Sequence, residues 1–175
     1  MRTQPQKIIS DLENTNSRND KESILQDAMN EGLDEFFEGV QMALDPLVTF
    51  GVKQVPEKKD PTGQGLSWEN FTEMTTKLVS RELTGHAARD AILIQMAVAT
   101  QEQWNGFYRR ILIKDLRCGV SEKTVNKVAK QCNKPEYTIP IFSCMLAHDS
   151  LKHEKKLTGK KQIEVKLDGV RVLTV

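Results

Sequence analysis

The sequence has 175 residues, 28% of them charged, and its 25 lysines and arginines nearly balance 24 aspartates and glutamates to give a net charge of +1. This length suffices for one domain with a sizeable core, or for one domain and part of another. The sequence contains no signal peptide, no membrane-length apolar run and no Cys-x-x-Cys spacing among its three cysteines. We therefore expect a soluble, cytoplasmic protein with reduced thiols, no membrane association, and neither a disulfide framework nor a protein-bound metal site.

The small net charge conceals an uneven distribution of charged residues. Residues 1–50 carry four basic side chains against ten acidic ones, whereas residues 109–134 carry eight basic side chains against two acidic ones. A locally basic surface is typical of nucleic-acid contact. A solvated helix face is the simpler alternative for such a charge run.

Apolar residues recur at helical spacing through most of the chain and predict a mainly α-helical first domain. Three short helices are expected before Pro46, followed by a long connection with several Gly and Pro residues over residues 48–65. Ser67 is predicted to cap the next helix, and Thr100-x-x-Gln103 has the form of a capping box. No repeat of fixed period is evident.

Two joints between predicted helices share the same chemistry. At Thr84-Gly85 and at Gly119-Val120-Ser121, a glycine allows the backbone to turn and a hydroxyl stands at the start of a new helix. Gly85 is predicted to end one helix, and Thr84 to cap the next. A helix N-terminus presents free N–H groups that suit a phosphate, although these residues could equally cap helices and bind nothing. The candidate contacts to a nucleic-acid backbone are Thr84, Gly85, Lys114, Arg117, Gly119, Ser121 and Lys123.

Residues 162–175 alternate apolar and polar side chains around an Asp-Gly step, which predicts a β-hairpin. Glu164, Lys166 and Asp168 would lie on one face of the first strand. A lysine amine becomes a nucleophile where its pKa is lowered in a partly dry pocket. Gly169 would allow close approach of a bulky ligand, and Arg171 offers a fork for an anion. An ordinary hairpin with solvated charges remains the alternative from the spacing alone.

The sequence Lys166-x-Asp168-Gly169-x-Arg171 resembles the K-x-D-G-x-R signature of the covalent nucleotidyltransferases, which comprise ATP-dependent DNA ligases, RNA ligases and messenger-RNA capping enzymes. The resemblance implies that Lys166 attacks the α-phosphate of ATP, with Mg²⁺ neutralising the triphosphate. It also implies that Glu164 and the Asp, Gly and Arg of the motif line the nucleotide pocket. The motif does not choose among these families.

A second resemblance favours the DNA ligases. Leu116-Arg117-Cys118-Gly119-Val120-Ser121, preceded by Lys114-Asp115, is similar to an element of the helical DNA-binding domain of ATP-dependent DNA ligases. Leu83-Thr84-Gly85, followed by Ala87-Ala88, resembles a second element of that domain. Met145-Leu146-Ala147 resembles the step that often opens the adenylation domain. The likeness is strongest to the T-even-type bacteriophage ligases.

These resemblances imply a helical DNA-binding domain at residues 1–145, a linker at 146–161 and the start of a truncated adenylation domain at 162–175. The intact enzyme would seal nicks in double-stranded DNA through a lysyl-AMP intermediate, using ATP and Mg²⁺. It would act as a monomer in the cytoplasm of a bacterium or of a phage-infected host, and replication proteins are further candidate partners. The 175 residues alone are expected to bind DNA without catalysing ligation. The alternatives are a non-catalytic helical DNA-binding module, or another nucleotidyltransferase that acts on RNA ends.

Overall fold

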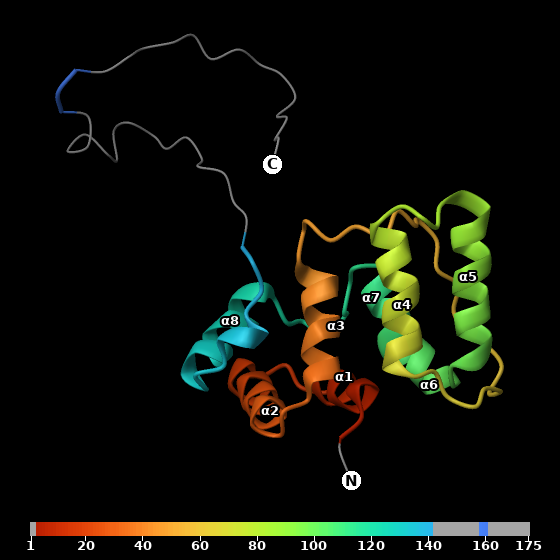
Figure 1. The fold of residues 1–175 in the computed structure, drawn as a ribbon. Helices are drawn as coiled ribbons and strands as arrows, with labels where there is room; N and C mark the ends of the chain where they lie inside the picture. Colours follow the sequence, from red (N-terminus) through yellow and green to blue (C-terminus); the bar gives the residue numbers. More distant parts are fainter. Residues whose placement is uncertain (1–2, 142–157, 161–175) are drawn as a thin grey trace. The chain divides into compact units, whose positions relative to one another are not determined.

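The computed structural model describes residues 3–141 and 158–160, and these residues form helices and loops without any strand (Figure 1). The predicted mainly α-helical character is therefore confirmed, whereas the predicted hairpin at 162–175 lies outside the described residues. The helices are, in chain order, α1 (Pro5–Glu13), α2 (Arg18–Asn30), α3 (Asp34–Leu44), α4 (Trp68–Val79), α5 (Gly85–Val98), α6 (Gln101–Gln103), the π-helical η1 (Trp104–Tyr108), α7 (Arg109–Leu112), α8 (Glu122–Gln131) and the 3₁₀-helical η2 (Pro135–Tyr137).

Side-chain caps begin three of these helices. The Ser17 and Ser67 hydroxyls each accept a hydrogen bond from a backbone N–H in the first turn of α2 and α4, at 3.3 Å. At α6, Gln103 N donates to Thr100 Oγ1, and Thr100 N donates back to Gln103 Oε1, both at 3.2 Å. The capping box and the cap at Ser67 are thus confirmed, because each side chain satisfies N–H groups that lack a partner within the helix.

The predicted role of Gly85 as the end of a helix is wrong. Helix α4 already ends at Val79, and the left-handed residue that follows it is Arg81, with φ of +66°. Gly85 is instead the first residue of α5, with φ of +55°. Thr84 stands at the predicted N-cap position, but its hydroxyl makes no capping hydrogen bond. Arg81 therefore takes the conformation that glycine usually supplies at the end of a helix.

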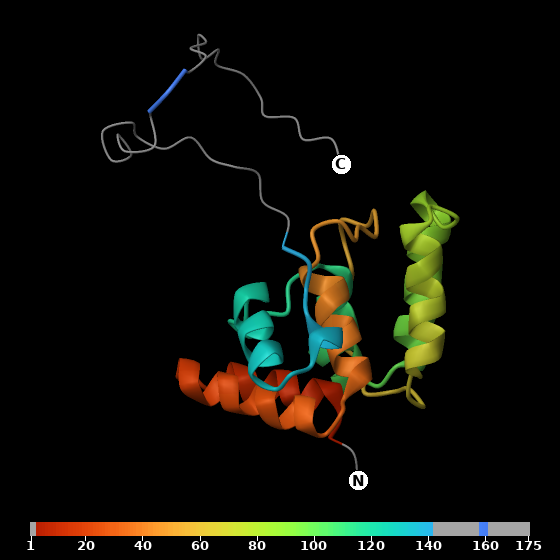
Figure 2. The same ribbon diagram turned by 60° about the vertical axis from the view of Figure 1, so that its left-hand side comes forward.

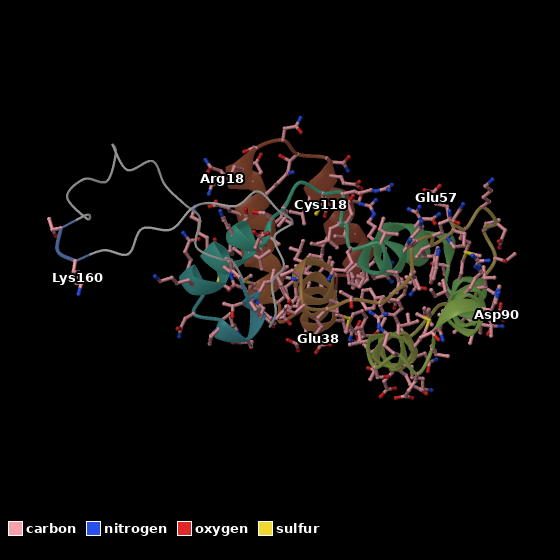
Figure 3. The ribbon with its side chains drawn as sticks, turned by 90° about the horizontal axis from the view of Figure 1, so that it is seen from above. Arg18, Glu38, Glu57, Asp90, Cys118 and Lys160 are labelled. Carbon is pink, nitrogen blue, oxygen red and sulfur yellow. The ribbon has the colours of Figure 1, made fainter. Side chains whose placement is uncertain are left out.

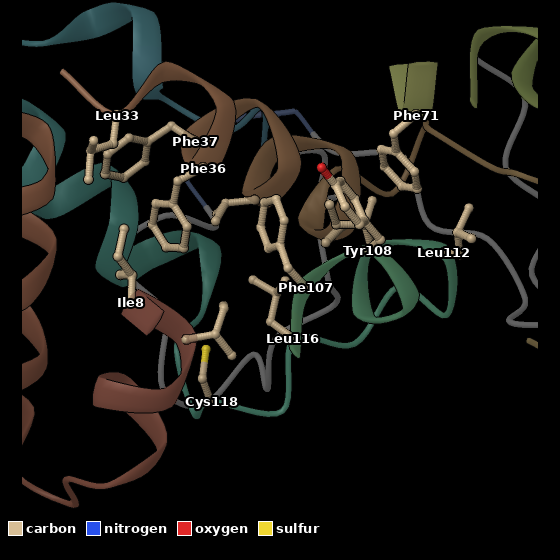
Figure 4. Close-up of a cluster of buried hydrophobic side chains, with 14 of the residues drawn as sticks. Ile8, Leu33, Phe36, Phe37, Phe71, Phe107, Tyr108, Leu112, Leu116 and Cys118 are labelled. Carbon is tan, nitrogen blue, oxygen red and sulfur yellow. The ribbon is translucent and has the colours of Figure 1, made fainter. Parts of the chain in front are cut away.

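An aromatic core joins α3, α4 and the run from α6 to α7 (Figure 4). The Phe36 and Phe107 rings stack with centroids 6.1 Å apart, and the Phe71 and Tyr108 rings are 4.5 Å apart. A Cβ atom at Gly39 would lie 2.5 Å from Phe107 Cζ. Gly39 therefore permits the close approach of α3 to η1 on which this core depends.

Two pairs of helices lie on either side of α3. Helices α2 and α8 pack together on one side, and α4 and α5 pack together on the other (Figure 2). These helices belong to one unit of the chain, Met1–Phe142, and Ser143–Val175 form a separate unit. Among residues 3–141 and 158–160, no helix combines the length and the apolar character needed to cross a bilayer.

The long connection between α3 and α4 is fixed by side chains that reach its backbone. Trp104 Nε1 donates to Pro56 O at 2.9 Å, and Arg109 Nε donates to Val55 O at 2.9 Å. Lys58 is only 2% exposed, and its ammonium donates to Met96 O and Ala97 O at 2.8 and 3.1 Å. Since these two carbonyls belong to the last turn of α5, Lys58 ties the connection to that helix.

We expect Lys58→Met to lower the free energy of unfolding by about 2 kcal/mol, because it removes charge-assisted hydrogen bonds to two carbonyls at the end of α5. The exposed neighbour Lys59 supplies the matched control, and Lys59→Met should change stability by less than about 0.5 kcal/mol. Urea unfolding followed by circular dichroism measures both variants. Equal midpoints for the two variants would contradict this role of Lys58.

Candidate nucleic-acid interface

The segment between α7 and α8 alternates buried and exposed residues. Leu116 and Cys118 are 3% and 2% exposed and point into the core (Figure 4), while Arg117 and Gly119 are exposed. Both exposed residues are left-handed, with φ of +53° and +66°. A non-glycine residue in this region costs about 1 kcal/mol, and such strain is found preferentially at functional sites. The burial of Leu116 and Cys118 holds the Arg117 side chain toward solvent.

The Arg117 guanidinium is only loosely engaged. Its Nε lies 3.6 Å from Asp115 Oδ2, and the two side chains are 53% and 62% exposed. The Arg117 backbone N–H donates to Asp115 Oδ1 at 3.0 Å, which fixes the turn. An exposed ion pair of this length is weak, so an incoming phosphate could replace Asp115 as the partner of the guanidinium.

Two further basic residues hold the backbone of this segment through hydrogen bonds to its carbonyls. Arg110 Nη1 donates to Leu116 O at 2.8 Å and pairs with Glu13 at 2.9 Å. Lys21 Nζ of α2 donates to Cys118 O at 2.7 Å and would lie 2.5 Å from a Cβ atom at Gly119. Lys21 therefore adds positive charge beside Gly119, although it precedes Cys118 by 97 residues and no local motif indicates the contact. Burial also raises the pKa of the Cys118 thiol, which leaves it protonated and unreactive.

The Lys114 ammonium is engaged within the fold. It donates to Met42 O, Asp45 O and Val48 O at 2.7, 2.6 and 2.7 Å, so all three N–H donors are used. Burial lowers the pKa of this ammonium, and the Asp45 carboxylate opposes the shift. In this structure Lys114 closes the end of α3 and the turn that follows it. The predicted contact of Lys114 with nucleic acid remains a prediction.

Ser121 and Lys123 lie at the start of α8, and both are exposed. The Ser121 hydroxyl is 3.3 Å from the Thr124 hydroxyl and makes no capping hydrogen bond to the helix backbone. No ion pair engages Lys123 within residues 3–141 and 158–160, and Glu122 occupies the first turn beside it. The first turn of α8 therefore has N–H groups and a lysine available to an anion, together with one opposing carboxylate.

Two adjoining hollows connect the region of Gly85 with Arg117. The larger has a volume of about 660 Å³, and the smaller, of about 370 Å³, shares four of its lining residues: Lys53, Gln54, Pro56 and Arg89. Arg117 lines the first hollow and Gly85 the second. We call this continuous feature the basic groove. The loop at residues 51–56 forms one wall and α5 forms another.

The cations of the basic groove come from separate parts of the sequence. They are Lys53, Arg89, Arg109 and Arg117, and the one carboxylate in the lining is Asp115. Two further acids, Glu57 and Asp90, follow the lining residues Pro56 and Arg89 in the sequence (Figure 3), and Glu57 Oε1 lies 3.3 Å from Arg109 Nη1. Lys53 stands within the long connection that the Gly and Pro residues of 48–65 predict. Arg89 is four residues after Gly85, one helical turn on, and this spacing could have indicated it as a neighbour of the joint.

The structure thus brings Gly85 and Arg117 to one groove, with Thr84 beside Gly85, while Ser121, Lys123 and Lys114 are not part of its lining. The predicted nucleotide-binding residues Glu164, Lys166, Asp168, Gly169 and Arg171 lie outside the described residues. Within residues 3–141 and 158–160, no cluster of His, Cys, Asp and Glu side chains is placed to hold a metal ion.

The chain is similar in sequence and structure to solved proteins. No protein-family model and no curated protein matches the sequence. The solved structures that match include Pmar-Lig_PreS3, with 63% identity and a TM-score of 0.81, and Pmar-Lig_Pre., with 62% identity and a TM-score of 0.80, each over 89% of this chain. The chain spans about a third of the length of these structures, 35% and 36%. Their names carry the element "Lig", and the similarity supports a ligase-like relationship for this chain.

Proposed function

We propose that this chain is the N-terminal portion of an ATP-dependent DNA ligase of the T-even bacteriophage type, and that its helical unit binds nicked double-stranded DNA. The observation that carries the proposal is the exposed, left-handed Arg117, which lies in the motif resembling that of the ligases and at one end of the basic groove. Gly85 at the start of α5, from the second such motif, lines the adjoining hollow. The similarity to the two solved structures supports the same reading.

DNA would be held chiefly through its phosphates. Arg117 offers a planar fork to one phosphate, and the free N–H groups at the start of α5 and α8 suit others. Lys21 and Lys123 add positive charge near Gly119 and Ser121. Contacts of this kind carry no base-pair information, so the binding should be sensitive to salt and nearly indifferent to sequence.

The chemistry of the intact enzyme would depend on residues 162–175. The Lys166 amine would displace pyrophosphate from ATP and form a P–N bond to AMP. The 5′-phosphate at the nick would then take the AMP from Lys166, and attack by the 3′-hydroxyl would release AMP and close the strand. Glu164, Asp168, Gly169 and Arg171 would line the nucleotide pocket, and Mg²⁺ would neutralise charge on the triphosphate.

We expect Arg117→Ala to weaken binding to nicked duplex DNA about tenfold at low salt, because it removes a charge-assisted contact to phosphate. The slope of log affinity against log salt should also fall by about 0.9. Arg18→Ala is the matched control, since Arg18 is 73% exposed on α2 and its substitution removes the same charge. Fluorescence anisotropy at several salt concentrations measures all three proteins. If the two variants bind equally well, Arg117 is not a contact.

Lys114 and Lys123 are expected to differ in their roles, although both belong to the predicted set of DNA contacts. Lys114→Met should lower the free energy of unfolding by about 3 kcal/mol, because three backbone carbonyls lose a charged donor. Lys123→Met should leave stability within about 0.5 kcal/mol and weaken DNA binding. Chemical unfolding and anisotropy of the folded proteins provide the two readouts. A stable Lys114→Met protein that loses DNA affinity would show that Lys114 is itself a DNA contact.

Lys166 is the proposed nucleophile that receives AMP. With Mg²⁺ and ATP labelled at the α-phosphate, the intact enzyme should acquire an acid-labile covalent label that Lys166→Ala abolishes, while Lys161→Ala retains it. Denaturing electrophoresis measures the label, and DNA binding by the Lys166→Ala protein should be unchanged. Label that persists in Lys166→Ala would place the nucleophile elsewhere. If no protein is labelled but DNA still binds, a non-catalytic DNA-binding module becomes the better account.

A further inference from the structure

Free positive charge is concentrated at the middle of the basic groove. No hydrogen bond or ion pair engages the side chains of Lys53 or Arg89 within the described part of the chain, and both residues are exposed. Arg109, by contrast, is committed to the fold, because its Nε donates to Val55 O and its Nη1 lies 3.3 Å from Glu57. The cations available to a ligand along the groove are therefore Lys53, Arg89 and the loosely paired Arg117.

The two unengaged cations are carried by walls that are already ordered. The loop bearing Lys53 is held on one side by Phe50, which is 3% exposed, and on the other by Val55, which is 5% exposed. Arg81 Nη2 also donates to Thr49 Oγ1 at 2.8 Å. Arg89 projects from α5, one turn after Gly85. A ligand would meet Lys53 and Arg89 without first having to order the loop.

We propose that Lys53 and Arg89 form a further phosphate-binding site, through which the backbone of one DNA strand continues along the basic groove from Arg117 toward Gly85. This inference rests on the proposed binding of DNA. It extends the contact surface to a loop and a helix face that lie outside both motifs resembling those of the ligases. Lys53 and Arg89 act here as binding residues and take no part in the transfer of AMP.

The arrangement fits an extended polyanion better than a small anion. The three available cations come from three segments: all three line the larger hollow, and Lys53 and Arg89 also line the smaller hollow that continues toward Gly85. A single phosphate would fill only part of these two hollows, whose volumes are about 660 and 370 Å³. A nucleic-acid strand presents a phosphate at each nucleotide, about 3.4 Å apart along the duplex axis, and can meet the cations in succession.

The test compares two double variants of this chain that remove the same charge. Lys53→Gln/Arg89→Gln alters the groove, and Lys7→Gln/Lys130→Gln alters two exposed lysines that line neither of its hollows. Affinity for nicked duplex is measured over a salt series. The groove variant should bind at least tenfold more weakly at low salt than the control variant, with a salt slope smaller by about 1.8 than that of the unaltered chain. Circular dichroism checks that both variants are folded.

Several outcomes would overturn the inference, and they are distinguishable from failure of the proposed function. If the unaltered chain binds DNA and Arg117→Ala weakens it, but the two double variants behave alike, Lys53 and Arg89 are not contacts and the proposed function stands. If the groove variant loses affinity for inorganic tripolyphosphate while keeping its DNA salt slope, the site takes small anions instead. If the unaltered chain does not bind DNA at all, the proposed function fails and this inference fails with it.

Discussion

Charged side chains that donate to backbone carbonyls hold the irregular parts of this helical unit in place. Lys58 bonds to the last turn of α5, and Lys114 to the end of α3 and the turn after it. Arg109 holds the connection at Val55, Arg110 holds the segment at Leu116, and Lys21 holds it at Cys118. Each bond satisfies a carbonyl that neither a helix nor a strand would satisfy. Because the connection between α3 and α4 has no regular structure, its conformation depends on these donors.

Because of such contacts, only some of the basic residues in the run at 109–134 are free to bind nucleic acid. Its first three cations, Arg109, Arg110 and Lys114, donate hydrogen bonds to backbone carbonyls within the fold. Lys127 pairs with Glu22 at 2.6 Å, and Lys134 lies 3.6 Å from Glu136. Lys123 and Lys130 remain exposed with no ion-pair partner within the described residues, and the exposed Arg117 has only Asp115, also 3.6 Å away. Of these three cations, Arg117 alone lies in the basic groove. A count of charges along the sequence therefore overstates the nucleic-acid surface of this run.

The features that could be predicted from sequence are those governed by neighbouring residues. The cap at Ser67 and the capping box at Thr100 depend on side chains within three residues, and both are present. The predicted role of Gly85 as a helix end is wrong because Arg81 already supplies the left-handed turn after α4. The buried Lys58 and the placement of Lys53 could not be predicted, since Lys58 bonds to residues 38 and 47 positions away and the loop that carries Lys53 is held by a bond between Val55 and Arg109, 54 positions apart. Local sequence patterns predict the starts of helices well and long-range contacts poorly.

The two loops that carry the exposed cations are already ordered by buried residues, so little conformational entropy would be lost when they bind a ligand. Leu116 and Cys118 are buried on either side of Arg117, and Phe50 and Val55 are buried on either side of Lys53. In both loops an apolar residue on each side anchors the backbone, and the basic residue between them stays exposed. A phosphate that meets these side chains has only the motion of the side chains to restrict, because the backbone conformation is already set. The strained φ of Arg117 is then maintained by the burial of its neighbours, so that its direction toward solvent is a property of the fold before any ligand is bound.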